Sequence, residues 1–144
     1  MNDLDKREVA LNTEIKKILI VDDDSDMQMF LSNLLEADGF SPIVAENSHD
    51  GLLYALKEHP GLIILDVPML KKRGIQILKN LKHDNRFKNI PIIIISPLDK
   101  KTLLQYRRSV KGFNDQDMDE PEAYLKKPFE AEELLEVIRR IAVN

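Results

Sequence analysis

The sequence predicts an α/β fold in which five parallel strands form one sheet and five helices cover its two faces. Two observations predict it. First, short apolar runs without polar alternation, such as residues 61–65 and 90–95, indicate strands that are buried on both faces. Second, stretches with apolar residues at helical spacing separate these runs. Strands that alternate with helices in this way are typical of a parallel sheet with right-handed crossover connections.

The first half of the chain supplies three strands and two helices. Ser25 and Gln28 have the spacing of a capping box, so we expect a helix to begin there. Leu52, Leu53 and Leu56 fall on one face of the next helix. The expected order is strand 15–21, a helix from 25 to about 38, strand 42–45, helix 48–58 and strand 61–66.

The second half continues the same alternation. A basic helix is expected to turn Leu103, Tyr106 and Val110 inward, and Pro128 is expected to stop the last strand. The expected order is a loop to residue 74, a helix through 77–81, strand 90–95 ending at 96, a helix from 100 to about 111, strand 123–127 and helix 130–142.

The size and composition of the chain fit one globular domain. Its 144 residues, 43% of them apolar and 32% charged, are enough to bury a core. We expect residues 15–144 to form this domain, and the polar residues 1–14 to form a loose arm or a short helix outside it. No apolar run is long enough to span a bilayer and the N-terminal residues do not resemble a signal peptide, so a soluble cytoplasmic protein is expected.

Composition also excludes several kinds of function. The absence of cysteine excludes a disulfide framework and a thiolate metal site. A net charge of -4 gives no support for nucleic acid binding, and no Gly-rich phosphate loop is found among the five glycines. The acids at positions 22, 24 and 26 fit a calcium loop, but Met27 and Asn33 do not fit its sixth and twelfth positions. Asp24 and Asp26 are therefore expected to be acids at the start of a helix.

Side chains that carry chemistry follow four of the expected strands, namely Asp22 and Asp23, Asp66, Ser96 and Lys127. The carboxyl ends of parallel strands meet at one edge of a sheet, so these groups are expected to lie together. A lone Asp66 would be read as a capping or turn residue, but gathered carboxylates repel one another unless a cation compensates them. Mg²⁺ suits carboxylate oxygens, and an ammonium and a hydroxyl suit phosphoryl oxygens. Together they indicate a phosphoryl-transfer site with an aspartyl-phosphate intermediate.

Four segments of the chain resemble the motifs of the response-regulator receiver domain of two-component signalling. They are residues 18–23, 65–66, 95–96 and 124–129, and the resemblance covers about residues 15–142. It implies a flavodoxin-like, doubly wound sheet with the strand order 2-1-3-4-5. It also implies Mg²⁺-dependent phosphorylation by a histidine kinase or a phosphotransfer protein.

The resemblance assigns roles to individual residues around the metal. Asp66 would be the phosphoacceptor. Asp23, Asp66 and the backbone carbonyl of Pro68 would bind Mg²⁺, and Asp22 would help through a bound water. Ser96 would donate a hydrogen bond to the phosphoryl group.

The last strand supplies the remaining roles. Lys127 would pair with the phosphoryl group, and it is favoured over Lys126 because it directly precedes the proline of the motif. The Lys127–Pro128 bond would be cis, as it commonly is in the family. Tyr124 matches the aromatic residue that turns inward on activation, although an ordinary core aromatic remains an alternative for it.

The resemblance implies a signalling domain that catalyses only its own phosphorylation and dephosphorylation. Its conformational change would act on a downstream protein through the helix from Lys100, strand 123–127 and the last helix, with a homodimer possible through the same face. Neither nucleic acid nor a membrane is an expected partner. One alternative is a docking module of the same fold that works without phosphorylation. Another is an Mg²⁺-dependent phosphatase, for which Pro68 stands where a second aspartate is needed.

The chain departs from the family pattern in three places. Pro68 and Leu70 alter the loop after Asp66, where the usual proline stands at position 70, so the lifetime of the phosphoryl group is open. Pro97 restricts Ser96 to an extended conformation. Residues 116–123 are an insertion with four acids, which we expect either to be a tolerated surface loop or to screen the partner face.

Overall fold

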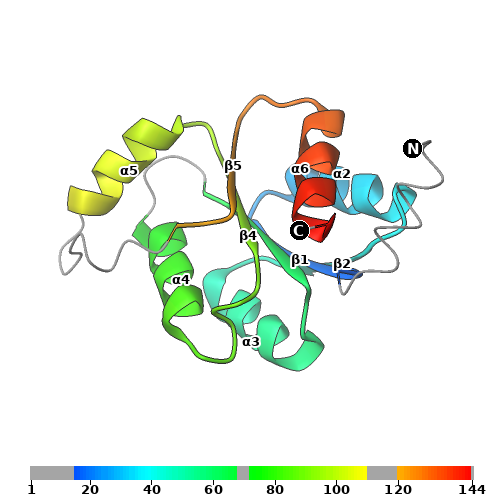
Figure 1. The fold of residues 1–144 in the computed structure, drawn as a ribbon, viewed down its shortest axis with the longest axis horizontal. Coiled ribbons are helices and arrows are strands. Elements are labelled where there is room, and N and C mark those ends of the chain that lie inside the picture. The colour runs from blue at the N-terminus through cyan, green and yellow to red at the C-terminus, as the bar shows by residue number, and fades with distance from the viewer. Residues whose placement is uncertain (1–14, 68–71, 110–119, 144) are drawn as a thin grey trace.

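The computed structural model describes residues 15–67, 72–109 and 120–143, within which the chain forms one five-stranded parallel sheet with five helices. The strand order is β2-β1-β3-β4-β5, which confirms the predicted fold class and the order implied by the resemblance (Figure 1). The strands are β1 (Lys17–Val21), β2 (Ser41–Ala45), β3 (Leu62–Asp66), β4 (Ile92–Ser96) and β5 (Ala123–Lys126).

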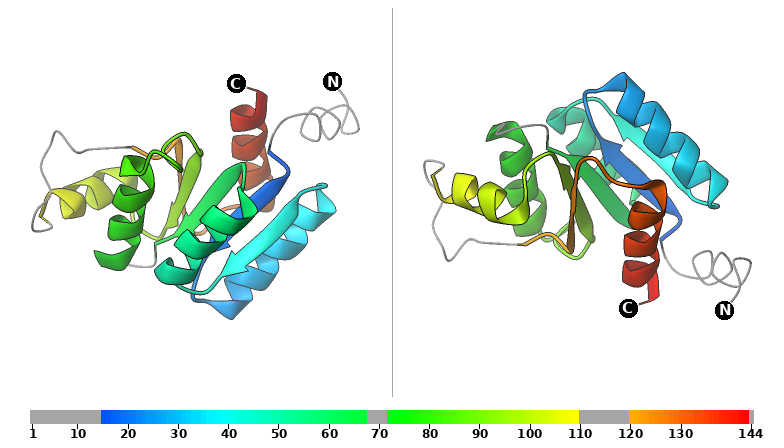
Figure 2. Two further views of the ribbon diagram at one scale, coloured as in Figure 1. Left: turned by 90° about the horizontal axis from the view of Figure 1, so that it is seen from below. Right: turned by 90° about the horizontal axis from the view of Figure 1, so that it is seen from above.

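The helices lie on both faces of the sheet (Figures 1 and 2). On one face are α2 (Ser25–Ala37) and α6 (Ala131–Val143). On the other are α3 (Ser48–Glu58), α4 (Lys72–His83) and α5 (Lys100–Ser109). In the described residues, no helix is both long and apolar enough to cross a membrane.

Two apolar cores, one on each face, hold this arrangement together. Every residue of β3 and β4 is buried, as the unbroken apolar runs predict. Successive side chains of a strand point to opposite faces, so Ile63 and Leu65 pack under α3 and α4 while Leu62 and Ile64 pack under α2 and α6. The sheet is therefore covered on both sides up to the edge where its strands end.

The start of α2 differs from the predicted capping box. The N-cap is Asp24, whose side chain accepts a hydrogen bond from the Asp26 backbone N–H at 3.0 Å. Ser25 is the first helical residue, and the Gln28 amide donates to the Asp22 carbonyl instead of reaching back to the cap. A carboxylate at this position accepts hydrogen bonds from the free N–H groups of the first turn. Its negative charge also interacts favourably with the positive end of the helix dipole. Asp24 and Asp26 are thus confirmed as acids of a helix start.

Two other helices also differ in detail from expectation. The backbone of α4 is helical from Lys72, so Gly74 lies within the helix and not in a loop before it; one glycine costs a helix only about 1 kcal/mol. In α3, the face that packs on the sheet includes only Leu52 of the three leucines, and Leu52 is partly buried. Gly51 and Ala55 are buried there, while Leu53 and Leu56 are each 42% exposed. Tyr106 and Val110, expected to point inward from α5, have side chains outside the described residues.

Candidate functional site

Asp66 ends β3 and lies next to the ammonium of Lys127. The distance from Lys127 Nζ to Asp66 Oδ2 is 2.7 Å, and the Asp66 side chain is 1% exposed. Lys127 directly follows β5, two strands away from β3 across β4. The prediction that the strand ends bring these two residues together is confirmed in the structure.

Lys127, and not Lys126, makes this contact. Lys126 belongs to β5 and its side chain is exposed. The backbone N–H of Lys127 donates to the Ser96 carbonyl at 2.8 Å, which fixes the end of β5 against β4. The Lys127–Pro128 peptide bond is cis, as the resemblance implies.

Asp22 directly follows β1, and its carboxyl group lies within hydrogen-bonding reach of Asp66. It is 3% exposed, and its Oδ1 accepts a hydrogen bond from the Asp24 backbone N–H at 2.9 Å. Burial, with the carboxyl of Asp66 within hydrogen-bonding reach, raises the pKa of Asp22 to about 8. The Asp24 N–H and the charge of Lys127 lower this pKa but do not outweigh the burial. Asp22 therefore takes up a proton more readily than an ordinary aspartate.

The acid pair leaves two oxygens without a hydrogen-bond donor in the described part of the chain. They are Oδ2 of Asp22 and Oδ1 of Asp66, both buried. A buried acceptor without a donor is costly, and two carboxylates cannot satisfy each other once both are ionised. A hard divalent cation bound by carboxylate oxygens would satisfy both atoms, so the donor set fits Mg²⁺.

Asp23, the third acid of the expected metal site, differs from this pair in its exposure to solvent. Asp23 is exposed, whereas Asp22 and Asp66 are buried. Within residues 15–67, 72–109 and 120–143, no three His, Cys, Asp or Glu side chains are grouped closely enough to hold a metal ion. Pro68, whose carbonyl is the remaining expected ligand, lies outside the described residues.

Ser96 ends β4 and is buried at the same edge of the sheet, with 2% of its surface exposed. Its Oγ accepts a hydrogen bond from the Leu98 backbone N–H at 3.1 Å. That leaves the hydroxyl hydrogen available to a group at the sheet edge, because a hydroxyl is both donor and acceptor. Ser96 also lies beside Lys127, because its carbonyl accepts the hydrogen bond from the Lys127 backbone N–H.

Tyr124 lies in β5 and packs against the core formed with Leu103 of α5. The ammonium of Lys100, the first residue of α5, is 5.3 Å from the centroid of the tyrosine ring. Sequence reasoning did not find this contact, because nothing in the local sequence of either residue signals it. A contact between two aromatic rings also has no signal in the local sequence. It joins Phe30 of α2 to Phe129 in the loop after Lys127, with ring centroids 6.2 Å apart.

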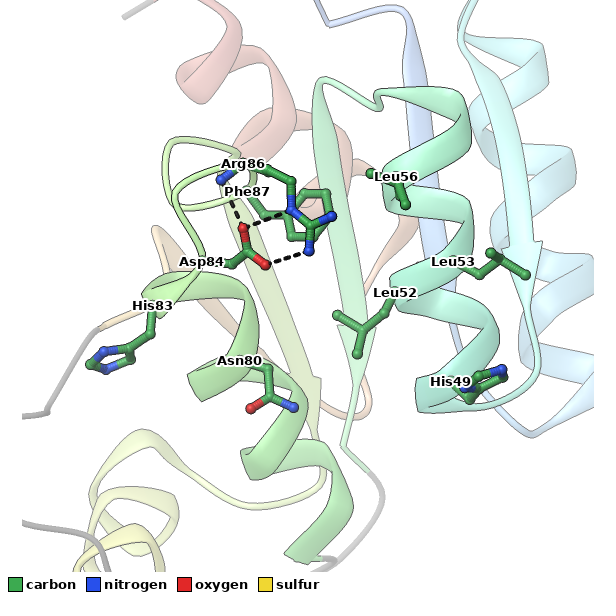
Figure 3. Close-up of a pocket in the computed structure, with 9 residues that line it drawn as sticks. All are labelled: His49, Leu52, Leu53, Leu56, Asn80, His83, Asp84, Arg86 and Phe87. Carbon is green, nitrogen blue, oxygen red and sulfur yellow. Dashed lines mark hydrogen bonds and ion pairs between the residues drawn. The ribbon is translucent and has the colours of Figure 1, made fainter.

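A separate pocket of about 550 Å³ lies between α3 and the end of α4 (Figure 3). Leucines of α3 form one wall, and Asn80, Phe87 and the Asp84–Arg86 ion pair lie on the other. His49 and His83 also line it and are exposed, as expected of surface histidines. None of the expected site residues is among those that line it.

At one edge of its parallel sheet, the chain brings together an acid pair, a hydroxyl and an ammonium. Residues 18–139 match the family model of the response regulator receiver domain, and the chain belongs to this family. It is accordingly a signalling domain.

Relatives and solved structures agree with this assignment. The chain is 32% identical over 125 residues to protein PilH of Pseudomonas aeruginosa, covering 87% of this chain and 96% of PilH. It is 38% identical over 133 residues to the transcriptional regulatory protein CpxR of Escherichia coli, covering 88% of this chain but only 49% of CpxR. The structure of chemotaxis protein CheY4 of Vibrio cholerae is similar, with a TM-score of 0.72, 25% identity and coverage of 88% of this chain and 98% of CheY4.

Proposed function

We propose that this domain accepts a phosphoryl group on Asp66 from a histidine kinase or a phosphotransfer protein. The phosphorylated form would signal to a downstream protein through the face formed by α5, β5 and α6, through which it could also form a homodimer. The proposed unit is residues 15–144, acting in the cytoplasm. The observation that carries the proposal is the buried Asp66 carboxylate with a cation 2.7 Å away and a second acid beside it.

The residues of the site support the following chemistry. An oxygen of Asp66 attacks the phosphorus of the donor, the bond from phosphorus to the donor nitrogen breaks, and its electron pair stays on the leaving imidazole. The phosphoryl group adds negative charge next to Lys127, so the Lys127 ammonium would pair with a phosphoryl oxygen. The Ser96 hydroxyl, which already accepts from Leu98, would donate to another phosphoryl oxygen.

The proposed metal ligands are Asp22, Asp23, Asp66 and the carbonyl of Pro68. When bound, Mg²⁺ would neutralise charge on the transferring phosphoryl group. The two buried carboxylate oxygens without a donor support this assignment. Binding requires both acids to be ionised, so the raised pKa of Asp22 would oppose metal binding as the pH falls.

Intact mass after incubation with acetyl phosphate and Mg²⁺ tests the proposal. We expect a gain of one phosphoryl group that disappears in Asp66→Asn and remains in Asp84→Asn, an acid on the far surface that pairs with Arg86. A gain that survives in Asp66→Asn would place the phosphoryl group elsewhere and refute the assignment.

A docking module that works without phosphorylation is the second candidate. One observation favours it: the charge of Asp66 is already met by Lys127 at 2.7 Å, so the fold is complete without a phosphoryl group. No mass gain with acetyl phosphate, or with a second small donor such as phosphoramidate, would favour this candidate over the first.

A further inference from the structure

The chain segment before β5 is fastened to the core of the domain by Glu122. Its Oε1 pairs with Lys82 of α4, whose side chain is only 8% exposed, and its Oε2 accepts a hydrogen bond from the Ile92 backbone N–H at 2.7 Å. The backbone N–H of Glu122 also donates to the Ile92 carbonyl at 2.9 Å. A lysine buried to this extent holds its partner firmly, because an unpaired buried charge is costly. Glu122 is therefore a fixed point of this segment.

Two residues earlier, Glu120 reaches the first turn of α5. Its Oε2 lies 3.8 Å from Lys100 Nζ, and both side chains are about half exposed. The same ammonium lies 5.3 Å from the ring centroid of Tyr124. One cation thus contacts a carboxylate of the inserted acidic segment and the face of an aromatic ring in β5.

We infer that Lys100 is a positioning residue that holds the Tyr124 ring in the arrangement seen here, and that Glu120 holds Lys100 in place. The three residues form a latch, defined as Glu120, Lys100 and Tyr124, on the face proposed to signal. This inference rests on the proposed function and on the role that the receiver resemblance gives Tyr124, which is to turn inward on activation. The Tyr124 hydroxyl is buried in this arrangement, so the ring already has the inward orientation that the resemblance links to activation, and the closed latch favours it.

The size of the effect follows from the exposure of the groups. An exposed cation–π contact or a surface ion pair changes an equilibrium by about two- to five-fold. A latch of this strength adjusts the balance between two arrangements and does not lock one of them. The acidic insertion would thereby tune how readily the domain is activated.

The test compares Lys100→Gln and Glu120→Gln with Lys101→Gln, a neighbouring exposed lysine of the same helix turn. Two properties are measured in each variant: the NMR resonances of the Tyr124 ring, assigned with Tyr124→Phe, and the rate of phosphoryl gain from acetyl phosphate. We expect Lys100→Gln to shift the ring resonances and lower the rate about two- to five-fold. Glu120→Gln should act in the same direction by less, and should add nothing in a Lys100→Gln background. Lys101→Gln should change neither property.

Ring resonances in Lys100→Gln that match those in Lys101→Gln would overturn the inference, as would additive effects of Lys100→Gln and Glu120→Gln. If the unaltered chain gains no phosphoryl group from any donor, the proposed function fails, but the ring resonances still decide whether the latch exists. Shifted resonances with an unchanged rate would show that the contact positions the ring without favouring activation, which would also overturn the inference.

Discussion

Oδ2 of Asp66 and Nζ of Lys127 lie 2.7 Å apart, although the two residues are 61 positions apart in the sequence. The contact exists because β3 and β5 flank β4 in one parallel sheet and end at the same edge. It places a cation against the carboxylate that we propose to be phosphorylated, beside the carboxyl group of Asp22, which follows β1.

Removal of this cation is expected to weaken the fold. Lys127→Ala would leave Asp66 and Asp22 buried without their positive neighbour, which should lower the free energy of unfolding by about 1–3 kcal/mol, since Lys127 is itself partly exposed. Urea denaturation at neutral pH measures this, with Lys126→Ala as the control. Equal losses in the two variants would show that the ion pair adds nothing to stability.

The stability of the metal-free domain should fall as the pH rises. Asp22 has a folded pKa of about 8 against an ordinary value of 3.8, so between these values the folded chain binds more protons than the unfolded chain. Unfolding then releases protons, and the free energy of unfolding decreases across this window and levels off above it, by a few kcal/mol at most. Urea midpoints in EDTA at pH 5 and pH 8 measure the loss, which Asp22→Asn should reduce. A profile for Asp22→Asn as steep as that of the unaltered chain would assign the pH dependence to other groups.

Mg²⁺ should stabilise the domain most where both acids are ionised. A ligand present at ten times its Kd contributes about 1.4 kcal/mol, so the melting temperature at pH 8 should rise with added Mg²⁺ and fall back with EDTA. The rise should be smaller at pH 5, because protonated Asp22 competes with the metal. NaCl of matched ionic strength is the control, and an equal rise with NaCl would mean that no specific site is filled. Asp66→Asn should abolish the difference between the two salts.

Glu122 should matter more to stability than Glu120. Glu122→Ala would leave the buried Lys82 ammonium unpaired and should cost about 2–4 kcal/mol, whereas the half-exposed Glu120 should cost less than about 1 kcal/mol. Thermal and urea unfolding of both alanine variants measure the contrast. Adding Lys82→Met to Glu122→Ala should recover part of the loss, because it removes the unpaired charge. Similar small losses for Glu122→Ala and Glu120→Ala would show that Lys82 is hydrated in solution.

The sequence predicted those features that depend on strand ends and apolar runs. Asp22, Asp66, Ser96 and Lys127 were placed correctly at the sheet edge because parallel strands bring their carboxyl ends together. The helix start was assigned to Ser25 in place of Asp24, since either neighbouring side chain can cap a helix and only the backbone conformation decides between them.

Other features depend on tertiary contacts that have no local signal. Nothing in the sequence distinguishes Lys82 or Glu122 from other charged residues. They pair because the fold brings the end of α4 beside the segment that leads into β5. The exposure of Leu53 likewise results from the close approach of α3 to the sheet at Gly51, where an added Cβ would lie 3.0 Å from a methyl group of Val21. The spacing of apolar residues identifies the apolar face of a helix, but it does not determine which residues of that face are buried against the sheet.

The attachment of Glu122 to Ile92 and Lys82 has a practical consequence for engineering the domain. Glu122, directly before β5, fixes the position at which this strand begins. The chain upstream should therefore tolerate lengthening, shortening or replacement by a reporter peptide without displacing Lys127. Graft libraries built immediately before Glu120 should therefore vary surface recognition while the sheet edge with Asp66 and Lys127 keeps its geometry.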